Sequence, residues 1–512
     1  MIAPLALHAA LALLACRCGD PPALPPGGDR PDVLLISIDT LRADHVGVYG
    51  YDRDTTPFLD ALAEGGVRFA HARSPAPWTL PSHTTMLSGL LPHQHHVVEG
   101  RLRIGADTPL LQEAFAAAGY ATGGFVSSLY VGRRFGFDRG FEVFEDFGVH
   151  GEKKNLKGVV DAEDVVDAAL GFTAARPDTP VFLFLHLYDV HYPYDAPAPW
   201  NTRFDRAPEP GDTRYKNYFV HMRQPLEPAQ LQHQIDQYDE ELAYVDDQLS
   251  RLIGAFRSAG RDPWVVVTAD HGEEFYERGS WGHAHTLFPE QLHVPLILAG
   301  PGAPEGRVVE DTVGLQDIAP TLGALVDAPM DGAGLPLWPA LEGAPLPARA
   351  FPSETSRFNT NRIGLWADGL RLDWDLAKGG RALYADPSEA EDLAADRPED
   401  VERLSGQLTA ILGAPWEADP GTVTTEGAIL MDGAQVRGPL TLGETARFAV
   451  IPVDADVFHG ALGPYRAAGG ERPPPDGPLR YLGAGSAGDA GALSDDERAR
   501  LEALGYLQGD AP

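Results

Sequence analysis

The stretch DVLLISID, residues 32–39, decides the fold. Its continuous apolar run is typical of a strand that is buried on both faces of a parallel sheet. Similar runs recur at residues 181–187 (VFLFLHL), 264–270 (WVVVTAD) and 294–300 (VPLILAG). Between the second and third runs, apolar residues spaced by three and four over residues 235–256 predict a helix. Strands separated by helices predict an α/β fold with a largely parallel sheet flanked by helices.

Charge limits what the protein can bind. Its 512 residues include 40 Lys and Arg against 74 Asp and Glu, a net charge of −34. Such a surface repels phosphate backbones, so we expect no nucleic-acid partner. An anionic substrate would need a local positive centre, such as a metal ion.

The N-terminal residues 1–18 read as a signal peptide, because their apolar run is too short to span a bilayer. The sequence LLAC resembles a bacterial lipobox, which would make Cys16 a lipid anchor and the protein's one membrane contact; ordinary cleavage near Ala15 is the alternative. Both cysteines, Cys16 and Cys18, lie here, so no disulfide framework is expected. We therefore predict an exported protein, a periplasmic or cell-envelope lipoprotein, with residues 19–31 as a Pro/Gly-rich linker.

Beyond the main domain, which we place at residues 32–345, the pattern weakens. Residues 362–376 predict a hairpin and residues 397–412 a helix, together a smaller α+β subdomain at 346–415. Residues 416–512 are rich in Gly and Pro and predict an irregular tail, ending in a short helix with a Ser494–Glu497 capping box.

Polar residues follow three of the buried runs. Asp39 closes the first, His186 and His191 belong to the second, and Asp270 with His271 closes the third. Ligands bind at the carboxyl ends of strands in open α/β sheets, so these groups should converge. Asp and His together suit a divalent cation, which predicts a shared metal site.

The segment TLPSHTTMLSG, residues 79–89, predicts a helix with Thr79 as its cap, Pro81 in its first turn and Gly89 beyond its end. Thr79 has two interpretations. It caps the helix, or it is a nucleophile, because a helix start is an anion site and a hydroxyl beside a cation can lose its proton.

Four ordered segments carry a family resemblance: VLLISIDTLRADHVGVYGY, TLPSHTTMLSG, LYDVHYPY and TADHGEEF…GHAHTLFPEQLHVPLI. They resemble the motifs of the sulfatase family, within the alkaline phosphatase superfamily, over residues 32–345. The segment ADGLRLDWDL…ALYADPSEAEDL resembles that family's C-terminal subdomain.

The resemblance implies an alkaline-phosphatase-like fold and a set of site residues. Asp39, Thr79, Asp270 and His271 would bind one divalent metal ion: Zn, Mn, Mg or Ca, with the histidine favouring Zn or Mn. Thr79 would also be the nucleophile, and His191 would contact the transferring or leaving group. His283 would be a further catalytic histidine, although its neighbour His285 is an equal alternative that we assign to substrate binding, together with His83.

The chain departs from the family at several of these positions. Thr79 stands where true sulfatases have the Cys or Ser that becomes formylglycine, so no formylglycine is expected. His83 replaces an Arg, Ser127 replaces a Lys, and a second Lys is absent near Ala284. Thr40 replaces the second Asp of an Asp-Asp pair.

These departures favour a metal-dependent hydrolase of phosphodiester, phosphonate or sulfate esters that uses a Thr nucleophile. A Thr ester needs attack from outside to be cleaved, whereas a formylglycine diol collapses by itself. One alternative is a phosphoglycerol- or phosphoethanolamine-type transferase acting on an envelope component. Another is a catalytically silent protein of the same fold that binds a metal or an anion.

Overall fold

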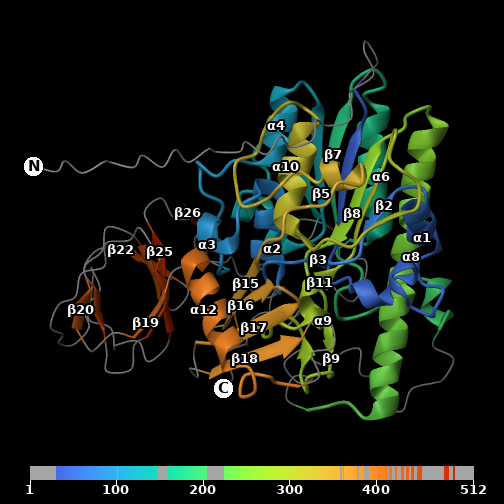
Figure 1. Cartoon of the computed structure of the whole chain (residues 1–512). Helices are drawn as coiled ribbons and strands as arrows, with labels where there is room; N and C mark the ends of the chain where they lie inside the picture. Colours follow the sequence, from blue (N-terminus) through green and yellow to red (C-terminus); the bar gives the residue numbers. More distant parts are fainter. Residues whose placement is uncertain are drawn as a thin grey trace, which may run out of the picture.

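The computed structural model of the chain describes residues 30–100, 102–147, 160–204, 224–357 and most of 360–412, with short strands between residues 414 and 490 (Figure 1). The predicted signal peptide, the predicted anchor at Cys16 and nearly all of the predicted linker lie outside the described residues.

The centre of the molecule is an eight-stranded sheet with the order β13-β2-β12-β8-β1-β7-β5-β6. The strands β1, β7, β8, β5 and β6 pair in parallel, which confirms the predicted α/β class. Every residue of β1, β7 and β8 is buried, as their unbroken apolar runs require. The eight strands are β1 (Val33–Ile38), β2 (Val67–Phe69), β5 (Ala121–Val126), β6 (Val143–Asp146), β7 (Val181–Leu187), β8 (Trp264–Ala269), β12 (Leu296–Ala299) and β13 (Arg307–Val309).

The fourth apolar run forms β12, which is antiparallel to both β8 and β2. A parallel pair needs a crossover connection, usually a helix of some length. Between β8 and β12 the chain forms only short elements: β9 (Glu274–Phe275), β10 (Trp281–Gly282), α9 (Pro289–Leu292) and β11 (His293–Val294). The same segment carries His271, His283 and His285. It therefore contributes residues to the candidate site instead of forming a crossover helix.

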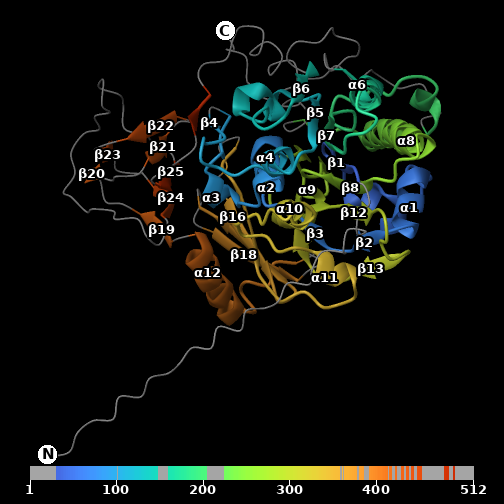
Figure 2. The same cartoon turned by 90° about the horizontal axis from the view of Figure 1, so that it is seen from above.

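Helices cover both faces of the sheet (Figures 1 and 2). One group packs beside β12, β7 and β5, and the other lies on the opposite face. The first group is α1 (Pro57–Glu64), α6 (Ala162–Ala174) and α8 (Pro228–Ser258), and the second is α2 (Thr79–Ser88), α4 (Leu111–Ala117) and α10 (Ile318–Ala324). Shorter elements are β3 (Ala72–Arg73), β4 (Leu102–Arg103), β14 (Val313–Gly314), α3 (Pro92–His95) and α11 (Trp338–Leu341).

The long helix α8 forms where the apolar spacing predicts a helix. Its stripe from Tyr238 to Phe256 is buried against the sheet side of the molecule. Its other positions are mostly polar. Among the residues that the structure describes, no helix combines the length and the apolar character needed to cross a membrane.

A second, antiparallel sheet follows the main domain, with order β15-β16-β17-β18. The predicted hairpin is β16 with β17, and the predicted helix α12 packs on this sheet around Leu365, Leu372, Leu404 and Leu408. The subdomain joins the main domain next to the site, because Thr355 Oγ1 donates to the carbonyl of Ala284 at 2.8 Å. The elements are β15 (Phe351–Thr355), β16 (Arg362–Ala367), β17 (Leu370–Asp375), β18 (Gly380–Ala385) and α12 (Pro398–Leu412).

The tail is not wholly irregular, which corrects the prediction for residues 416 onward. Short runs with β-branched and aromatic residues lie between its glycines and pair as strands. Strands this short show too few alternating positions to stand out in a segment rich in Gly and Pro. The predicted terminal helix lies outside the described residues. The strands are β19 (Ala414–Glu417), β20 (Gly421–Val423), β21 (Ala428–Met431), β22 (Ala434–Arg437), β23 (Leu440–Leu442), β24 (Arg447–Ile451), β25 (Pro478–Gly483) and β26 (Gly488–Asp489).

Candidate active site and metal centre

The carboxyl ends of three adjacent strands bring the site together. Strand β1 lies between β7 and β8, and Ile38 pairs with Leu187 on one side and with Ala269 on the other. Asp39 and Asp270 therefore leave the sheet at the same level. Both carboxylates are fully buried.

Asp39, Asp270 and His271 form a compact group at this edge. His271 Nε2 lies 3.6 Å from Asp39 Oδ1 and 3.3 Å from Asp270 Oδ2. The other oxygen of Asp270 accepts hydrogen bonds from the backbone N–H groups of Thr40 at 3.3 Å and His271 at 2.9 Å. His271 Nδ1 donates to the carbonyl of Gly272 at 2.9 Å, which leaves Nε2 as the nitrogen with the lone pair.

These residues fit a divalent cation. Donor atoms around a tetrahedral zinc ion with bonds of about 2.0–2.1 Å lie roughly 3.3 Å apart. The spacings of 3.3 and 3.6 Å in this group are close to that value. Burial, with Asp39 beside it, raises the pKa of Asp270, so the pair of carboxylates needs a positive partner.

Thr79 lies against this group at the start of α2. Its hydroxyl is 3.4 Å from His271 Nε2, and its side chain is 1% exposed. The prediction that Thr79 caps the helix is wrong by one position, because Trp78 occupies the N-cap and Thr79 is the first helical residue. Gly89 ends the helix at φ 74°, as predicted. Thr79 thus lies beside the unpaired N–H groups of a helix start.

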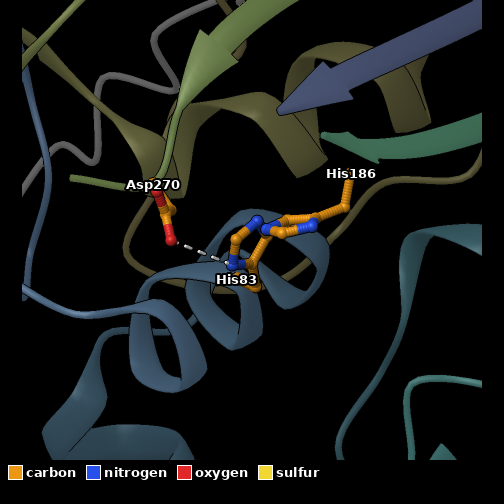
Figure 3. Close-up of side chains that lie close together, drawn as sticks. All are labelled: His83, His186 and Asp270. Carbon is orange, nitrogen blue, oxygen red and sulfur yellow. Dashed lines mark ion pairs between the residues drawn. The ribbon is translucent and has the colours of Figure 1, made fainter. Parts of the chain in front are cut away.

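His83 and His186 lie close to Asp270 (Figure 3). His83 Nδ1 is 2.8 Å from the carbonyl of Thr79 and 3.5 Å from Asp270 Oδ2, and Nε2 is 2.9 Å from Ser37 Oγ. Burial lowers the pKa of His83 to about 3, so the ring is neutral at neutral pH. The assignment of His83 to substrate binding stays a prediction.

His191 and His283 form the wall opposite the strand ends. Their rings lie 5.0 Å apart, and the His283 ring lies 4.4 Å from that of His271. His191 Nδ1 donates to the carbonyl of Tyr192 at 2.6 Å. His283 Nδ1 is 2.8 Å from Glu273 Oε1, and the hydroxyl of Tyr194 donates to the other oxygen of that carboxyl at 3.3 Å.

The structure separates the two histidines that the sequence could not tell apart. His283 lies beside His271 with its ring tilted by 39°, whereas His285 Nε2 lies 3.2 Å from Glu274 Oε2. His285 Nδ1 donates to the carbonyl of His283 at 2.9 Å. His285 therefore bonds within its own loop, and its assignment to substrate binding stays a prediction.

Sequence reasoning missed Ser37 and Glu273. Ser37 is the one polar residue inside the strand β1, and it bonds to His83. Glu273 follows Asp270 and His271 in an acidic run, and it bonds to His283. A polar residue in an otherwise apolar strand and a carboxyl two positions after a ligand were the available signals.

Comparison with known proteins adds the family. The Sulfatase family model matches residues 31–328, more than half of the 512 residues. The chain belongs to the sulfatase family. Family members are metal dependent, this protein is a sulfatase-family ester hydrolase, and Asp39, Asp270 and His271 form a group that could hold a metal ion.

Individual relatives span most of the chain. The Delta 4,5-hexuronate-2-O-sulfatase of Bacteroides thetaiotaomicron is 25% identical over 413 residues, covering 72% of this chain and 85% of its own. Human arylsulfatase A is 23% identical over 487 residues, covering 81% and 89%. Among solved structures, a phosphonate monoester hydrolase from Silicibacter pomeroyi matches with a TM-score of 0.61 and 26% identity, covering 74% of this chain and 94% of its own.

Two positions that depart from the sulfatase-family pattern have structural roles here. Ser127 Oγ donates to the carbonyl of His186 at 2.9 Å and accepts from the N–H of Tyr188 at 3.0 Å, which joins β5 to the end of β7. Thr40 adopts φ 57° and bonds through its hydroxyl to the carbonyl of Val190 at 2.8 Å. Both residues shape the backbone around the metal group.

Proposed function

We propose that this sulfatase-family enzyme hydrolyses phosphodiester, phosphonate or sulfate esters with Thr79 as the nucleophile. The observation that carries the proposal is the position of Thr79 Oγ1, 3.4 Å from His271 Nε2 at the start of a ten-residue helix. A hydroxyl placed there faces both the cation-binding group and helix N–H groups that favour anions.

Asp39, Thr79, Asp270 and His271 would hold one divalent cation. When bound, that ion supplies the positive charge that lowers the pKa of the Thr79 hydroxyl and offsets the charge of the substrate's non-bridging oxygens. Asp39 and Asp270 are held by the sheet, and His271 by Gly272, so the ligand positions are pre-arranged.

The covalent step then uses this chain's own groups. Thr79 releases its hydroxyl proton to solvent, and Oγ forms a bond to phosphorus or sulfur while the bond to the leaving oxygen breaks. Water cleaves the resulting Thr79 ester and the hydroxyl regains its proton. A Thr ester has no route for self-collapse, and phosphoryl esters are the intermediates that water removes in this way, so phosphorus substrates are favoured over sulfate.

His283 is placed to protonate the leaving oxygen, with His191 as its neighbour. Burial raises the pKa of Glu273 well above its ordinary value and lowers that of His283, so the pair keeps a proton on the carboxyl. His283 then accepts that hydrogen bond at Nδ1 and carries its own proton at Nε2. As Nε2 gives this proton to the leaving oxygen, Nδ1 takes the proton from Glu273.

One relative supports the choice of phosphorus. The Silicibacter pomeroyi structure is that of a phosphonate monoester hydrolase, and it matches 74% of this chain. The hexuronate sulfatase relative keeps sulfate esters within the proposal.

The test is turnover of four nitrophenyl esters (phosphate monoester, phosphodiester, phenylphosphonate and sulfate) by metal-loaded protein. Thr79→Ala should lower phosphodiester or phosphonate turnover by at least about 10³-fold, because the nucleophile is gone. Thr84→Ala is the matched control: it removes a buried hydroxyl from the same helix, one that donates to the carbonyl of Leu80. Equal turnover by wild type and Thr79→Ala would refute the proposal. Turnover that requires an added alcohol would assign the transferase instead.

A further inference from the structure

The two oxygens of Asp39 face two different groups of ligands. Asp39 Oδ1 lies 3.6 Å from His271 Nε2, on the side of Thr79. Asp39 Oδ2 lies 3.2 Å from His186 Nε2. Asp270 is shared through a single oxygen, because its Oδ2 is 3.3 Å from His271 Nε2 and 3.5 Å from His83 Nδ1. The two carboxylates thus stand between a Thr79–His271 side and a His83–His186 side.

His186 has the surroundings of a ligand rather than of a core histidine. Its side chain is fully buried, and neither of its ring nitrogens makes a hydrogen bond within the part of the chain that the structure describes. Asp270 Oδ2 likewise has no hydrogen-bond partner among those residues. Buried polar atoms are nearly always hydrogen-bonded, so buried atoms without such bonds, within 4.8 Å of one another, indicate a missing partner.

His83 can act as a ligand together with His186 and Asp270 if its tautomer changes. In one tautomer, Nδ1–H donates to the carbonyl of Thr79 at 2.8 Å and the hydroxyl of Ser37 donates to Nε2 at 2.9 Å. In the other, Nε2–H donates to Ser37 Oγ, and Nδ1 gives up its bond to the Thr79 carbonyl and presents its lone pair toward Asp270 Oδ2, 3.5 Å away. A serine hydroxyl serves as donor or acceptor, so both tautomers keep the bond to Ser37. Figure 3 shows His83, His186 and Asp270 turned toward one another from α2, β7 and the end of β8.

We propose that His83, His186 and Asp270 bind a second divalent cation, with Asp39 and Asp270 lying between it and the first. The potential ligand atoms of the three residues all lie within 4.8 Å of one another. Two imidazoles with carboxylates favour Zn²⁺ or Mn²⁺ over Mg²⁺ or Ca²⁺. The inference rests on the proposed function only in sharing these two carboxylates.

A second cation would balance the negative charge that a bound substrate adds to the site. Asp39 and Asp270 carry two negative charges, which a single divalent ion balances. An anionic ester would then make the buried site negative again, and a second divalent ion would offset the added charge. Two cations at about 3.5–4 Å also hold attacking and leaving oxygens of a displacement at once.

The first test counts ions on the full chain without substrate. Chelator-treated protein is titrated with Zn²⁺ by calorimetry, and bound zinc is measured by elemental analysis after dialysis. Wild type should bind two equivalents, His186→Ala one and His271→Ala one. His95→Ala, which removes a buried histidine that is bonded to Thr85 outside both groups, should keep two. One equivalent in wild type would overturn the inference, and so would two in His186→Ala.

The second test needs no variant, so a folding defect cannot confuse it. Two Mn²⁺ ions joined by carboxylates should give a spin-coupled electron paramagnetic resonance spectrum at saturation, whereas one isolated Mn²⁺ gives an uncoupled six-line spectrum. The six-line spectrum at saturation would overturn the second site. Two bound ions with no ester turnover would support this inference and refute the nucleophile; one ion with Thr79-dependent turnover would do the reverse.

Discussion

On the strand side of the site, His83 and His271 bond to backbone carbonyls and a serine hydroxyl. On the loop side, His283 bonds to the carboxyl of Glu273. The carbonyl bonded to His271 Nδ1 leaves Nε2 turned toward the two carboxylates, whereas a carboxyl lies behind the His283 ring. The two sides therefore differ in their partners, and we propose that they differ in role: the sheet edge binds the cation, and the loop after β8 supplies the proton.

The largest expected effect comes from removing a carboxylate at the sheet edge. Asp270→Asn removes a carboxylate that faces both histidine groups, so bound metal should fall and kcat/KM should drop by about 10³-fold or more, since cation stabilisation of the transition state amounts to several kcal/mol. Elemental analysis and nitrophenyl ester kinetics measure both effects. Full activity with metal retained would show that Asp270 is no ligand.

Removing His283 on the loop side should lower activity by an amount that depends on the leaving group. His283→Ala should cost about 10²–10⁴-fold for esters of alkyl alcohols, which need a proton on the leaving oxygen. It should cost far less for nitrophenyl esters, whose leaving group departs as an anion. His285→Ala, which alters the neighbouring ring bonded to Glu274, is the matched control. Equal losses with both kinds of ester would contradict the acid role.

The strands and helices that carry the site were predictable because each is a local pattern. The apolar runs of β1, β7 and β8 and the spacing of α8 identify these elements, and the polar residues at the strand ends identify Asp39 and Asp270. The direction of β12 was not predictable, since it depends on what the intervening chain does instead of crossing the sheet.

Contacts between residues far apart in the sequence could not be predicted either. The Ser37–His83 bond joins residues 46 positions apart, and no periodicity in either segment points to the other. The choice between His283 and His285 depends on which ring turns inward, a matter of side-chain geometry in a loop. Thr79 at the first helical position rather than the cap is a shift of one residue, within the ordinary uncertainty of helix ends.

A smaller effect should follow when the proton behind His283 is removed. Glu273→Gln keeps a hydrogen bond to Nδ1 and cannot pass on a proton, so kcat for alkyl esters should fall by about 10–100-fold with KM unchanged. Glu274→Gln changes the adjacent buried carboxyl, which faces His285, and should leave kcat as it is. A rise in KM instead would show that Glu273 shapes the pocket rather than supplying the proton.

The last expected effect concerns the free energy of unfolding rather than the rate of catalysis, and it tests the histidines of the sheet edge. Burial lowers the pKa of His83 to about 3 and of His186 to about 4, below the usual value of about 6.5. Between pH 6.5 and 4 the unfolded chain therefore binds protons that the folded, metal-free protein does not, and stability must fall as pH falls. Each such histidine contributes roughly 1.4 kcal/mol per pH unit within this window. Urea unfolding of chelator-treated protein at pH 6.5, 5.5 and 4.5 should show that slope, and His83→Gln should reduce it by about the share of one histidine. An unchanged slope in His83→Gln would mean that His83 is protonated in the folded protein, which would place a positive charge on the sheet edge and remove the distinction between its two sides.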